Sequence, residues 1–432
     1  MKKHLFTILK IIKWIVIVFV ALIILFLAVV YTGKAIRRIT PRGGINETQY
    51  VEVNGQEMWI SIYGKDINNP VLLYLHGGPG YSSSYADYAI LNKLAEDYTI
   101  VNWDQRSCGR TWLKNKDDDT EITLELMRSD ICVMTDYILD YLGKDKLTIM
   151  GISWGSFYGI DFAYKYPQKV ECYIGLSQTV GYYEDFVRYN MSGWVEMAKI
   201  LKAADYLSSE EYELAEQIDL IELEQYLTET SVGNTATVSS KSKDAFFKLL
   251  SSHKKKVLSE MSEHGYADPF RECDINILAS VLFCPYYTLW ETYQVYKVYD
   301  DSIYNGLSVE THSPGEDNSF LDRTEYQCPV YFLLAENDLS CDPKMAELYF
   351  ESINAPDKGL GYTTGGHECT MYHSEDLVNF IHQAVLDINY KIKIRSFYQI
   401  IMHSFYHQIV SFSPYKMFWR RYDFPFIVTT VE

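Results

Sequence analysis

The sequence has no pair of cysteines in CxxC spacing and no Cys/His cluster with zinc-finger spacing, although it holds eight cysteines in 432 residues. This absence argues against a structural zinc site, and most of the cysteines are expected to be small, buried hydrophobic residues. Basic residues are also fewer than acidic ones, 39 against 57, so the formal net charge is −18. A nucleic-acid binder needs a basic surface, so this charge argues against nucleic acid as a partner.

One long hydrophobic run does stand near the N-terminus. It is an uninterrupted apolar stretch of 18 residues, Trp14 to Tyr31, with basic residues on both sides. At 1.5 Å per residue, a helix of this length just crosses the hydrocarbon core of a bilayer. A cleavable signal peptide is the alternative, but its apolar stretch would be shorter, and AVVYTGKA is a poor cleavage site. We therefore predict an uncleaved single-pass anchor in a membrane, with lipid as its partner.

The orientation of this anchor is not fixed by the positive-inside rule, because both flanks are equally basic. We favour an anchor whose N-terminus is cytoplasmic and whose following chain is extracytoplasmic. Residues 32–46 then form a polar linker, with Pro41 and Gly43-Gly44 as breakers.

Short strands are predicted from residue 47 onward. TQYVEV and QEMWISIY flank Asn54-Gly55, which is the strongest short signal for a hairpin turn because both residues tolerate positive φ. Five apolar runs then alternate mostly with helical-looking segments, and this alternation predicts a parallel sheet covered by helices on both faces. The runs lie at 71–75, 98–103, 146–150, 171–176 and 329–334.

Two further regions differ from this pattern. Residues 181–323 are mostly helical in pattern and hold 25 acidic against 12 basic residues, so they carry most of the negative charge. Residues 388–432 are aromatic and basic. They form either an amphipathic tail that contacts the membrane or an irregular extension that packs on the core.

A candidate nucleophile stands in Gly151-Ile152-Ser153-Trp154-Gly155, a G-x-S-x-G pentapeptide. The apolar strand KLTIM runs straight into it, and the helical segment SFYGIDFAYKY leaves it. A sharp turn between strand and helix lifts the serine Oγ above the sheet edge, and the flanking glycines remove side chains that would clash there. The context therefore favours Ser153 as a nucleophile over a serine in an ordinary turn.

A serine hydroxyl needs a base to take its proton and a carboxylate to orient that base. With a nucleophile in this turn, the acid and then the histidine follow in the chain. PVYFLLAEND supplies Asp338 just after a late strand, with Glu336 and Asp342 as weaker candidates. His367 follows the strand-like GLGYTT and two glycines. We predict that Asp338 and His367 complete a catalytic triad.

The oxyanion that forms during acyl transfer needs two preorganised N–H donors. One is expected to be the backbone N–H of Trp154. The other is expected in His76-Gly77-Gly78-Pro79-Gly80, which follows the strand VLLYL. Gly78 is our candidate, and His76 is expected to be structural.

The sequence resembles the proline iminopeptidases, serine aminopeptidases of the α/β-hydrolase fold. The resemblance rests on HGGPG at 76–80, DQRSCGRT at 104–111 and GISWGS at 151–156, and it covers roughly 48–387. It departs from the family pattern DQRGxGRS, because Ser107 replaces a glycine and Thr111 a serine. The resemblance implies an α/β fold with a mostly parallel sheet and a helical cap insert. The DQR segment is expected to brace the active-site loops.

The resemblance also implies release of an N-terminal residue, often proline, from short peptides, with cap carboxylates holding the free amine. An acidic insert fits that role because a buried ammonium needs a carboxylate partner. The segment FCPYYTL at 283–289 has Tyr286 where related hydrolases have an acid. Glu272 and Asp274 are the weak candidates for the amine-binding carboxylates.

The predicted organisation has five parts. They are the anchor and linker (1–46), the first part of the hydrolase core (47–180), the cap insert (181–323), the second part of the core (324–387) and the C-terminal extension (388–432).

The leading functional hypothesis is a membrane-anchored aminopeptidase that forms an acyl-enzyme on Ser153 and takes a short peptide. An esterase or amidase acting on small acyl substrates uses the same machinery and is the alternative. A catalytically inactive, membrane-tethered binding protein is a third hypothesis. We expect no cofactor and no metal. A cap pocket with a carboxylate near the scissile bond would favour the peptidase, and an all-apolar pocket would favour the esterase.

Overall fold

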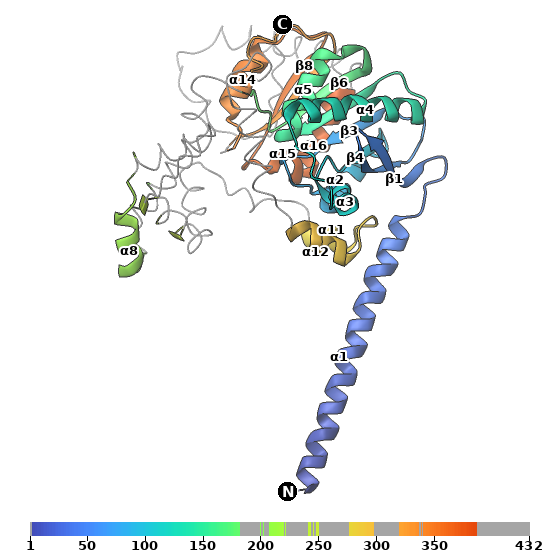
Figure 1. Ribbon diagram of the computed structural model, residues 1–432, viewed down its shortest axis with the longest axis vertical. Helices are drawn as coiled ribbons and strands as arrows, with labels where there is room; N and C mark the ends of the chain where they lie inside the picture. Colours follow the sequence, from blue (N-terminus) through green and yellow to red (C-terminus); the bar gives the residue numbers. More distant parts are fainter. Residues whose placement is uncertain are drawn as a thin grey trace, which may run out of the picture.

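The computed structural model describes residues 2–181, 207–219, 276–297 and 319–386 apart from Asn337 and Leu339, with a few isolated residues between 199 and 249. At its centre is an eight-stranded sheet of order β1-β2-β4-β3-β5-β6-β7-β8 (Figure 1). The strands are β1 (Ile45–Val53), β2 (Gln56–Gly64), β3 (Val71–Leu75), β4 (Thr99–Trp103), β5 (Leu147–Ile152), β6 (Val170–Leu176), β7 (Val330–Ala335) and β8 (Lys358–Thr363).

Helices occupy both faces of this sheet and extend beyond it. They are α1 (Lys2–Arg37), α2 (Ser84–Leu91), η1 (Asn92–Leu94), α3 (Gly109–Lys114), α4 (Leu124–Leu142), α5 (Trp154–Lys165), η2 (Pro167–Lys169), α8 (Ser209–Glu216), α11 (Ile277–Leu282), α12 (Leu289–Lys297), α14 (Pro343–Ser352), α15 (Cys369–Tyr372), α16 (Ser374–Phe380) and η3 (Ile381–Leu386). All the predicted strand runs are strands in the structure.

The hairpin forms at the predicted turn. β1 and β2 pair in antiparallel register, with Val53 opposite Gln56. Asn54 and Gly55 both have positive φ, 45° and 84°, as the turn requires. β1 begins at Ile45, which is two residues before the predicted start of the core.

The rest of the sheet is parallel, except that β2 pairs antiparallel with β4. Successive residues of its strands serve two separate cores because side chains alternate between faces. On β3, Leu73 and Leu75 pack with α4, α5 and α14, whereas Leu72 and Tyr74 pack with α2, α15 and α16. Both faces are therefore buried, which explains the continuous apolar strands.

The long helix α4 begins and ends at local sequence signals. At its N-terminus the Thr123 hydroxyl accepts a hydrogen bond from the Leu126 N–H, a cap that stabilises a helix by about 1 kcal/mol. At its C-terminus Gly143 adopts the left-handed conformation, with φ 61°, which ends the helix at little cost.

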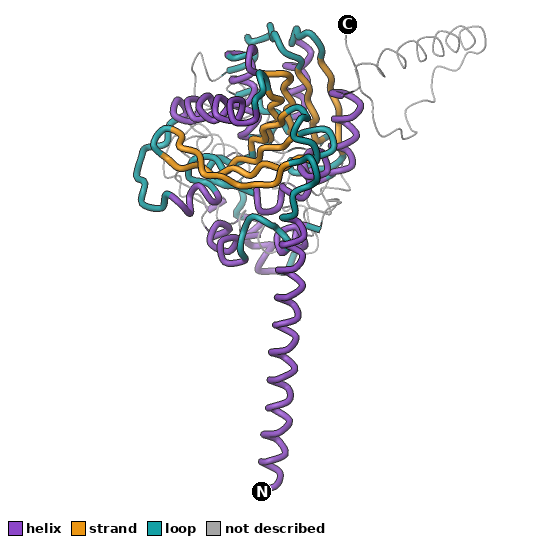
Figure 2. Tube along the Cα trace, turned by 90° about the vertical axis from the view of Figure 1, so that its right-hand side faces the viewer, coloured by secondary structure: helices purple, strands orange, loops and turns teal. Residues whose placement is uncertain are grey.

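The N-terminal helix α1 projects from the globular part as one straight element (Figures 1 and 2). Its residues 9–37 form a 29-residue segment that is apolar enough to cross a membrane, and only 6% of its most apolar stretch is buried. Of the predicted cap insert, the described residues include the helices α8, α11 and α12. Glu272, Asp274 and residues 388–432 lie outside the described part of the chain.

Candidate active site

Ser153 lies in the sharp turn between β5, which ends at Ile152, and α5, which begins at Trp154. Its backbone is strained, with φ 52° and ψ −120°. The two glycines of the pentapeptide are required by close packing. A Cβ on Gly151 would lie 2.3 Å from the carbonyl oxygen of Gly155, and a Cβ on Gly155 would lie 2.1 Å from the carbonyl oxygen of Leu75. The pentapeptide therefore builds the turn that the sequence predicted.

The predicted acid and base meet at the carboxyl ends of the last two strands. Asp338 follows β7, and its Oδ1 accepts hydrogen bonds from the N–H groups of Ser340 and Cys341 at 2.7 and 2.8 Å. His367 follows β8, and its Nδ1 lies 2.8 Å from Asp338 Oδ2. The Asp338 side chain is 1% exposed, so the ion pair lies in a poorly solvated environment.

The other acids considered in this region have different positions. Glu336 is exposed, and Asp342 caps α14 by accepting the Lys344 N–H at 2.9 Å. Of the three, Asp338 alone contacts His367 in the described part of the chain.

The pKa of His367 is set by opposing effects. Burial lowers it, whereas the Asp338 carboxylate, through charge and hydrogen bonding, and the Glu368 carboxylate raise it; the resulting pKa is about 9. The imidazolium is therefore strongly stabilised. Such stabilisation is what a triad base needs when it takes the serine proton.

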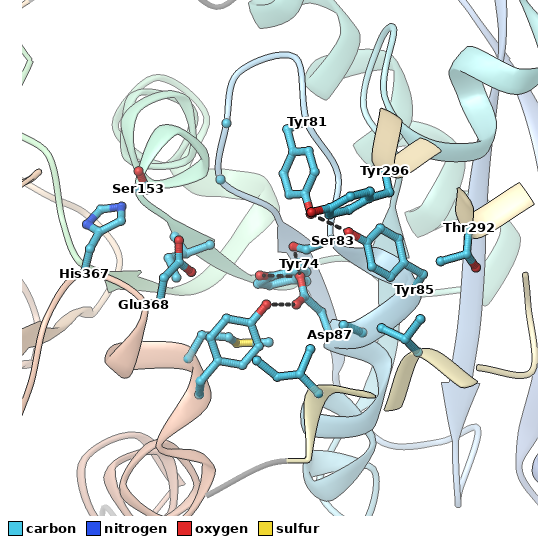
Figure 3. Close-up of a pocket in the computed structure, with 18 of the residues that line it drawn as sticks. Tyr74, Tyr81, Ser83, Tyr85, Asp87, Ser153, Thr292, Tyr296, His367 and Glu368 are labelled. Carbon is cyan, nitrogen blue, oxygen red and sulfur yellow. Dashed lines mark hydrogen bonds between the residues drawn. The ribbon is translucent and has the colours of Figure 1, made fainter. Parts of the chain in front are cut away.

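Ser153 and His367 line the same cavity, which has a volume of about 820 Å³. Figure 3 shows the two side chains next to each other at one end of it. Gly77 and Gly78 line the cavity as well, and a Cβ on Gly77 would lie 3.5 Å from Ser153 Cβ. Trp154 is the first residue of α5, where N–H groups have no acceptor within the helix. Trp154 thus directly follows Ser153 in the chain, and the loop that holds Gly77 and Gly78 lies beside Ser153 in space.

The His76 side chain holds the glycine loop in place. It is fully buried; its Nδ1 hydrogen-bonds the Gly77 carbonyl at 2.6 Å, and its Nε2 accepts the Gln105 N–H at 3.2 Å. Gln105 in turn donates from Nε2 to the His76 carbonyl at 3.0 Å. This arrangement is structural, and it joins the glycine loop to the DQR segment.

The DQR segment is itself a brace between distant parts of the core. Asp104 accepts hydrogen bonds from Ser82 Oγ at 2.6 Å and from the Tyr287 hydroxyl. Arg106 forms a bidentate pair with Asp130, and neither side chain is exposed. Removing one member of such a pair leaves a buried charge unpaired, which costs about 3–5 kcal/mol.

Two carboxylates that the sequence analysis did not single out also line the cavity. Glu368 is half-buried directly after His367, and Asp87 lies on α2 with 1% exposure. Figure 3 shows Glu368 beside His367 and Asp87 farther along the same cavity. The position of Glu368 directly after the predicted base His367 could have identified it from the sequence, whereas no motif marks Asp87.

Asp87 accepts hydrogen bonds from Ser83 Oγ at 2.5 Å, from the Tyr372 hydroxyl at 3.0 Å and from the Tyr74 hydroxyl at 3.1 Å. Burial raises its pKa, these hydrogen bonds lower it, and the Glu368 charge raises it again, so that the pKa is about 7. Further tyrosines, including Tyr81 and Tyr85, complete this wall.

Cys341 is a third residue that the sequence analysis did not place at the site. Its thiol hydrogen-bonds Ser153, and burial raises its pKa well above the usual range. Asp338, Cys341 and His367 offer potential metal ligands within 4.8 Å of one another. The Asp338–His367 hydrogen bond already uses two of these groups, as a triad requires.

Residues 70–374 match the family model described as the alpha/beta hydrolase fold. The chain therefore belongs to the α/β-hydrolase family. This outcome confirms the predicted fold class and the predicted resemblance.

Among individual proteins, the chain is 31% identical over 130 residues to YbaC of Bacillus subtilis, named a probable aminopeptidase. It is also 31% identical over 161 residues to a proline iminopeptidase of Clostridium botulinum. These matches cover 30% and 34% of this chain and 41% and 51% of the two relatives. The chain thus spans about half the length of the curated relatives it matches, or less.

Among solved structures, the proline iminopeptidase of Mycobacterium smegmatis aligns with a TM-score of 0.47 and 18% identity, covering 79% of this chain and 99% of that one. A membrane phospholipase A aligns with a TM-score of 0.48 and 14% identity, covering 89% and 99%.

Proposed function

We propose that this chain is a membrane-anchored serine aminopeptidase that releases an N-terminal residue, with proline as a candidate, through an acyl-enzyme on Ser153. The Ser153 Oγ attacks the substrate carbonyl, and His367 Nε2 takes its proton while Asp338 holds Nδ1. The N–H groups of Trp154 and Gly78 stabilise the oxyanion. His367 then protonates the leaving amine, and water hydrolyses the ester.

One observation supports the aminopeptidase most directly, namely a carboxylate in the cavity that Ser153 and His367 line. A peptide that enters with its N-terminus first must desolvate an ammonium, which is costly without an anionic partner. Glu368 is the accessible partner, because it is half-buried in the cavity that holds Ser153. Asp87 lies farther along the same cavity and adds negative potential where it is ionised. Both acids come from the core rather than from the predicted cap positions.

The esterase or amidase alternative is favoured by the aromatic lining of the same cavity. Tyrosines and the aliphatic residues of α11, such as Leu278 and Val281, offer a surface for an uncharged acyl group. An uncharged substrate would leave the Glu368 carboxylate without a partner. An aminopeptidase activity therefore explains the charged residue of the cavity, which an esterase activity does not.

The test is a panel of aminoacyl-naphthylamides carrying Pro, Ala or Leu, with N-acetylated Pro and short acyl esters beside them. N-acetylation of a good substrate is expected to lower kcat/KM by about 100-fold or more, or ~3 kcal/mol of transition-state binding. Equal rates on free and blocked substrates would reject the aminopeptidase and leave the esterase.

A fluorophosphonate probe tests whether the chain is an enzyme at all. The probe should label the wild-type chain and should not label Ser153→Ala, because only an activated serine reacts. An unlabelled wild-type chain would support the inactive binding protein.

The anchor is part of this proposal. Most apolar side chains of α1 are exposed, including Phe19 and Ile24 at 63% and 62%, and a soluble protein would leave this surface in water. The 29 residues of the apolar segment span ~44 Å, which is more than the ~30 Å of a bilayer core. We infer an extracytoplasmic catalytic domain, which protease treatment of intact cells would test. The mass of the membrane-extracted chain would show whether the helix is retained.

A further inference from the structure

The last turns of α1 pack directly on the loop that joins α11 to α12. Lys34 Nζ donates to the Tyr287 carbonyl at 2.6 Å, and Arg38 Nε donates to the Pro285 carbonyl at 2.8 Å. The Arg37 guanidinium lies 5.1 Å from the centre of the Phe283 ring. The loop between α11 and α12 thus contacts the chain a few residues after the apolar run of α1 ends.

Close packing reinforces these bonds. A Cβ on Gly33 would lie 2.5 Å from a ring carbon of Phe283, so the helix and the loop are in direct contact. Val30, one turn earlier, is 1% exposed, in contrast to the rest of the apolar run. If α1 spans a bilayer, this loop lies at the bilayer surface.

The two helices on either side of this loop form one wall of the active-site cavity. Ile277, Leu278 and Val281 of α11 line the cavity, as do Tyr293 and Tyr296 of α12. Figure 1 shows this pair of helices at the end of the globular part from which α1 leaves. The cavity wall and the end of the anchor are therefore neighbours.

This pair of helices also exposes large apolar side chains, which we call the α11–α12 surface: Leu278, Trp290, Tyr293 and Tyr296. Leu278 and Tyr296 are each 69% exposed and Trp290 is 64% exposed. Trp and Tyr are enriched where a membrane protein meets the headgroup layer, because one end of each ring is apolar and the other is polar.

We propose that the α11–α12 surface lies in the headgroup layer of the membrane that α1 spans, and that the cavity takes its substrate from that layer. The substrate would then be an amphiphile, with a cleavable amide or ester at its polar end and an apolar chain held in the bilayer. The contacts of Lys34, Arg37 and Arg38 hold this surface at the end of α1. Because α1 is the proposed membrane anchor, we infer that lipid contacts the surface. The inference rests on the proposed anchoring.

Photo-crosslinking tests the contact itself. Benzoylphenylalanine is introduced in the full chain at position 290, at position 24 in the middle of α1, or at position 348 on α14, where Ile24 and Leu348 are 62% and 59% exposed. The proteins are irradiated in nanodiscs of phosphatidylcholine and phosphatidylglycerol, and lipid adducts are detected by mass spectrometry. We expect adducts at 24 and 290 and none at 348.

The possible outcomes separate the inference from its premise. An adduct at 24 without one at 290 overturns the surface contact and leaves the anchor intact. No adduct at 24 overturns the anchoring and the inference with it. A crosslink from 290 to a second copy of the chain also overturns the inference, because the occupant is then protein.

Substrate delivery is tested with two amides of one N-terminal residue, a dodecylamide embedded in the nanodisc and a water-soluble methylamide. Trp290→Ser is expected to lower the ratio of kcat/KM for the dodecylamide to that for the methylamide by about threefold or more. Leu348→Ser is the matched control and should leave the ratio unchanged. An unchanged ratio in Trp290→Ser overturns the delivery step. Failure of the wild-type chain to cleave the methylamide instead marks failure of the proposed aminopeptidase.

Discussion

The catalytic edge of the sheet and the wall formed by α11 and α12 are held in place in different ways. Ser153, Asp338 and His367 each stand within four residues of a strand end, so the sheet itself brings them together. The α11–α12 wall is instead held by long-range contacts, such as those of Lys34 and Tyr287. The predicted triad residues are thus placed by the sheet itself, whereas the α11–α12 wall of the cavity depends on contacts between segments far apart in the chain.

The largest effect expected at the catalytic edge comes from the acid. Asp338→Asn should lower kcat by on the order of 10⁴-fold, because the amide no longer stabilises the imidazolium or fixes its tautomer. Glu336→Gln, an exposed acid two residues earlier, is the matched control and should remain near wild-type. Steady-state kinetics on the preferred naphthylamide would decide between them. Greater damage from Glu336→Gln would mean that the acid has been misassigned.

A smaller and more selective effect is expected at Glu368, which lies next to His367 in the same cavity. Glu368→Gln should lower kcat/KM for free-amine substrates by roughly 10–100-fold, the worth of one charge-assisted hydrogen bond. The N-acetylated substrate should lose no activity, because it has no ammonium for Glu368 to bind. The variant would therefore lose most of its preference for the free amine. If both substrates lost activity equally, Glu368 would be supporting the triad rather than the substrate.

The same carboxylate also affects the pH dependence of the predicted base. The pKa of His367 is about 9, so the rate of fluorophosphonate inactivation should rise with pH through about 9, as the imidazolium loses its proton. The Glu368 charge raises this pKa, so Glu368→Gln should move the inflection to lower pH. The probe carries no amine, which keeps substrate ionisation out of the profile. An inflection unmoved by the substitution would show that the two side chains are not coupled.

The raised pKa of His367 also makes the stability of the fold depend on pH. Because the folded-state pKa of His367 is raised, its contribution to the free energy of unfolding is fully present below the unfolded pKa of ~6.5. That contribution is lost as pH rises through about 9.

The smallest expected effect is the difference in stability between two truncations of α1, one that keeps its last turns and one that removes them. Deleting residues 1–29 should give a more soluble chain with near-normal activity on soluble substrates, because the contacts of Lys34 and Arg38 remain. Deleting residues 1–43 removes both hydrogen bonds and should lower the free energy of unfolding by about 1–3 kcal/mol. Denaturant titration of the two truncations measures the difference. Equal stability would show that the α11–α12 wall does not depend on α1.

Much of the fold was readable from the sequence because its signals are local. Asn54-Gly55 specified a turn through backbone conformation, and continuous apolar runs specified strands buried on both faces. Gly151 and Gly155 specified the nucleophile turn, because no side chain fits beside the backbone there. Chain order then indicated Asp338 and His367.

The tertiary structure alone decided which residues surround that chemistry. Asp87 and Cys341 carry no motif. Asp87 lines the cavity and Cys341 contacts Ser153 only because α2 and the loop after β7 fold over the same sheet edge. Tyr287 reaches Asp104 across 183 positions of the chain, and Lys34 reaches Tyr287 across 253. A local pattern cannot encode such distances, because the contact depends on the packing of every element between its two partners.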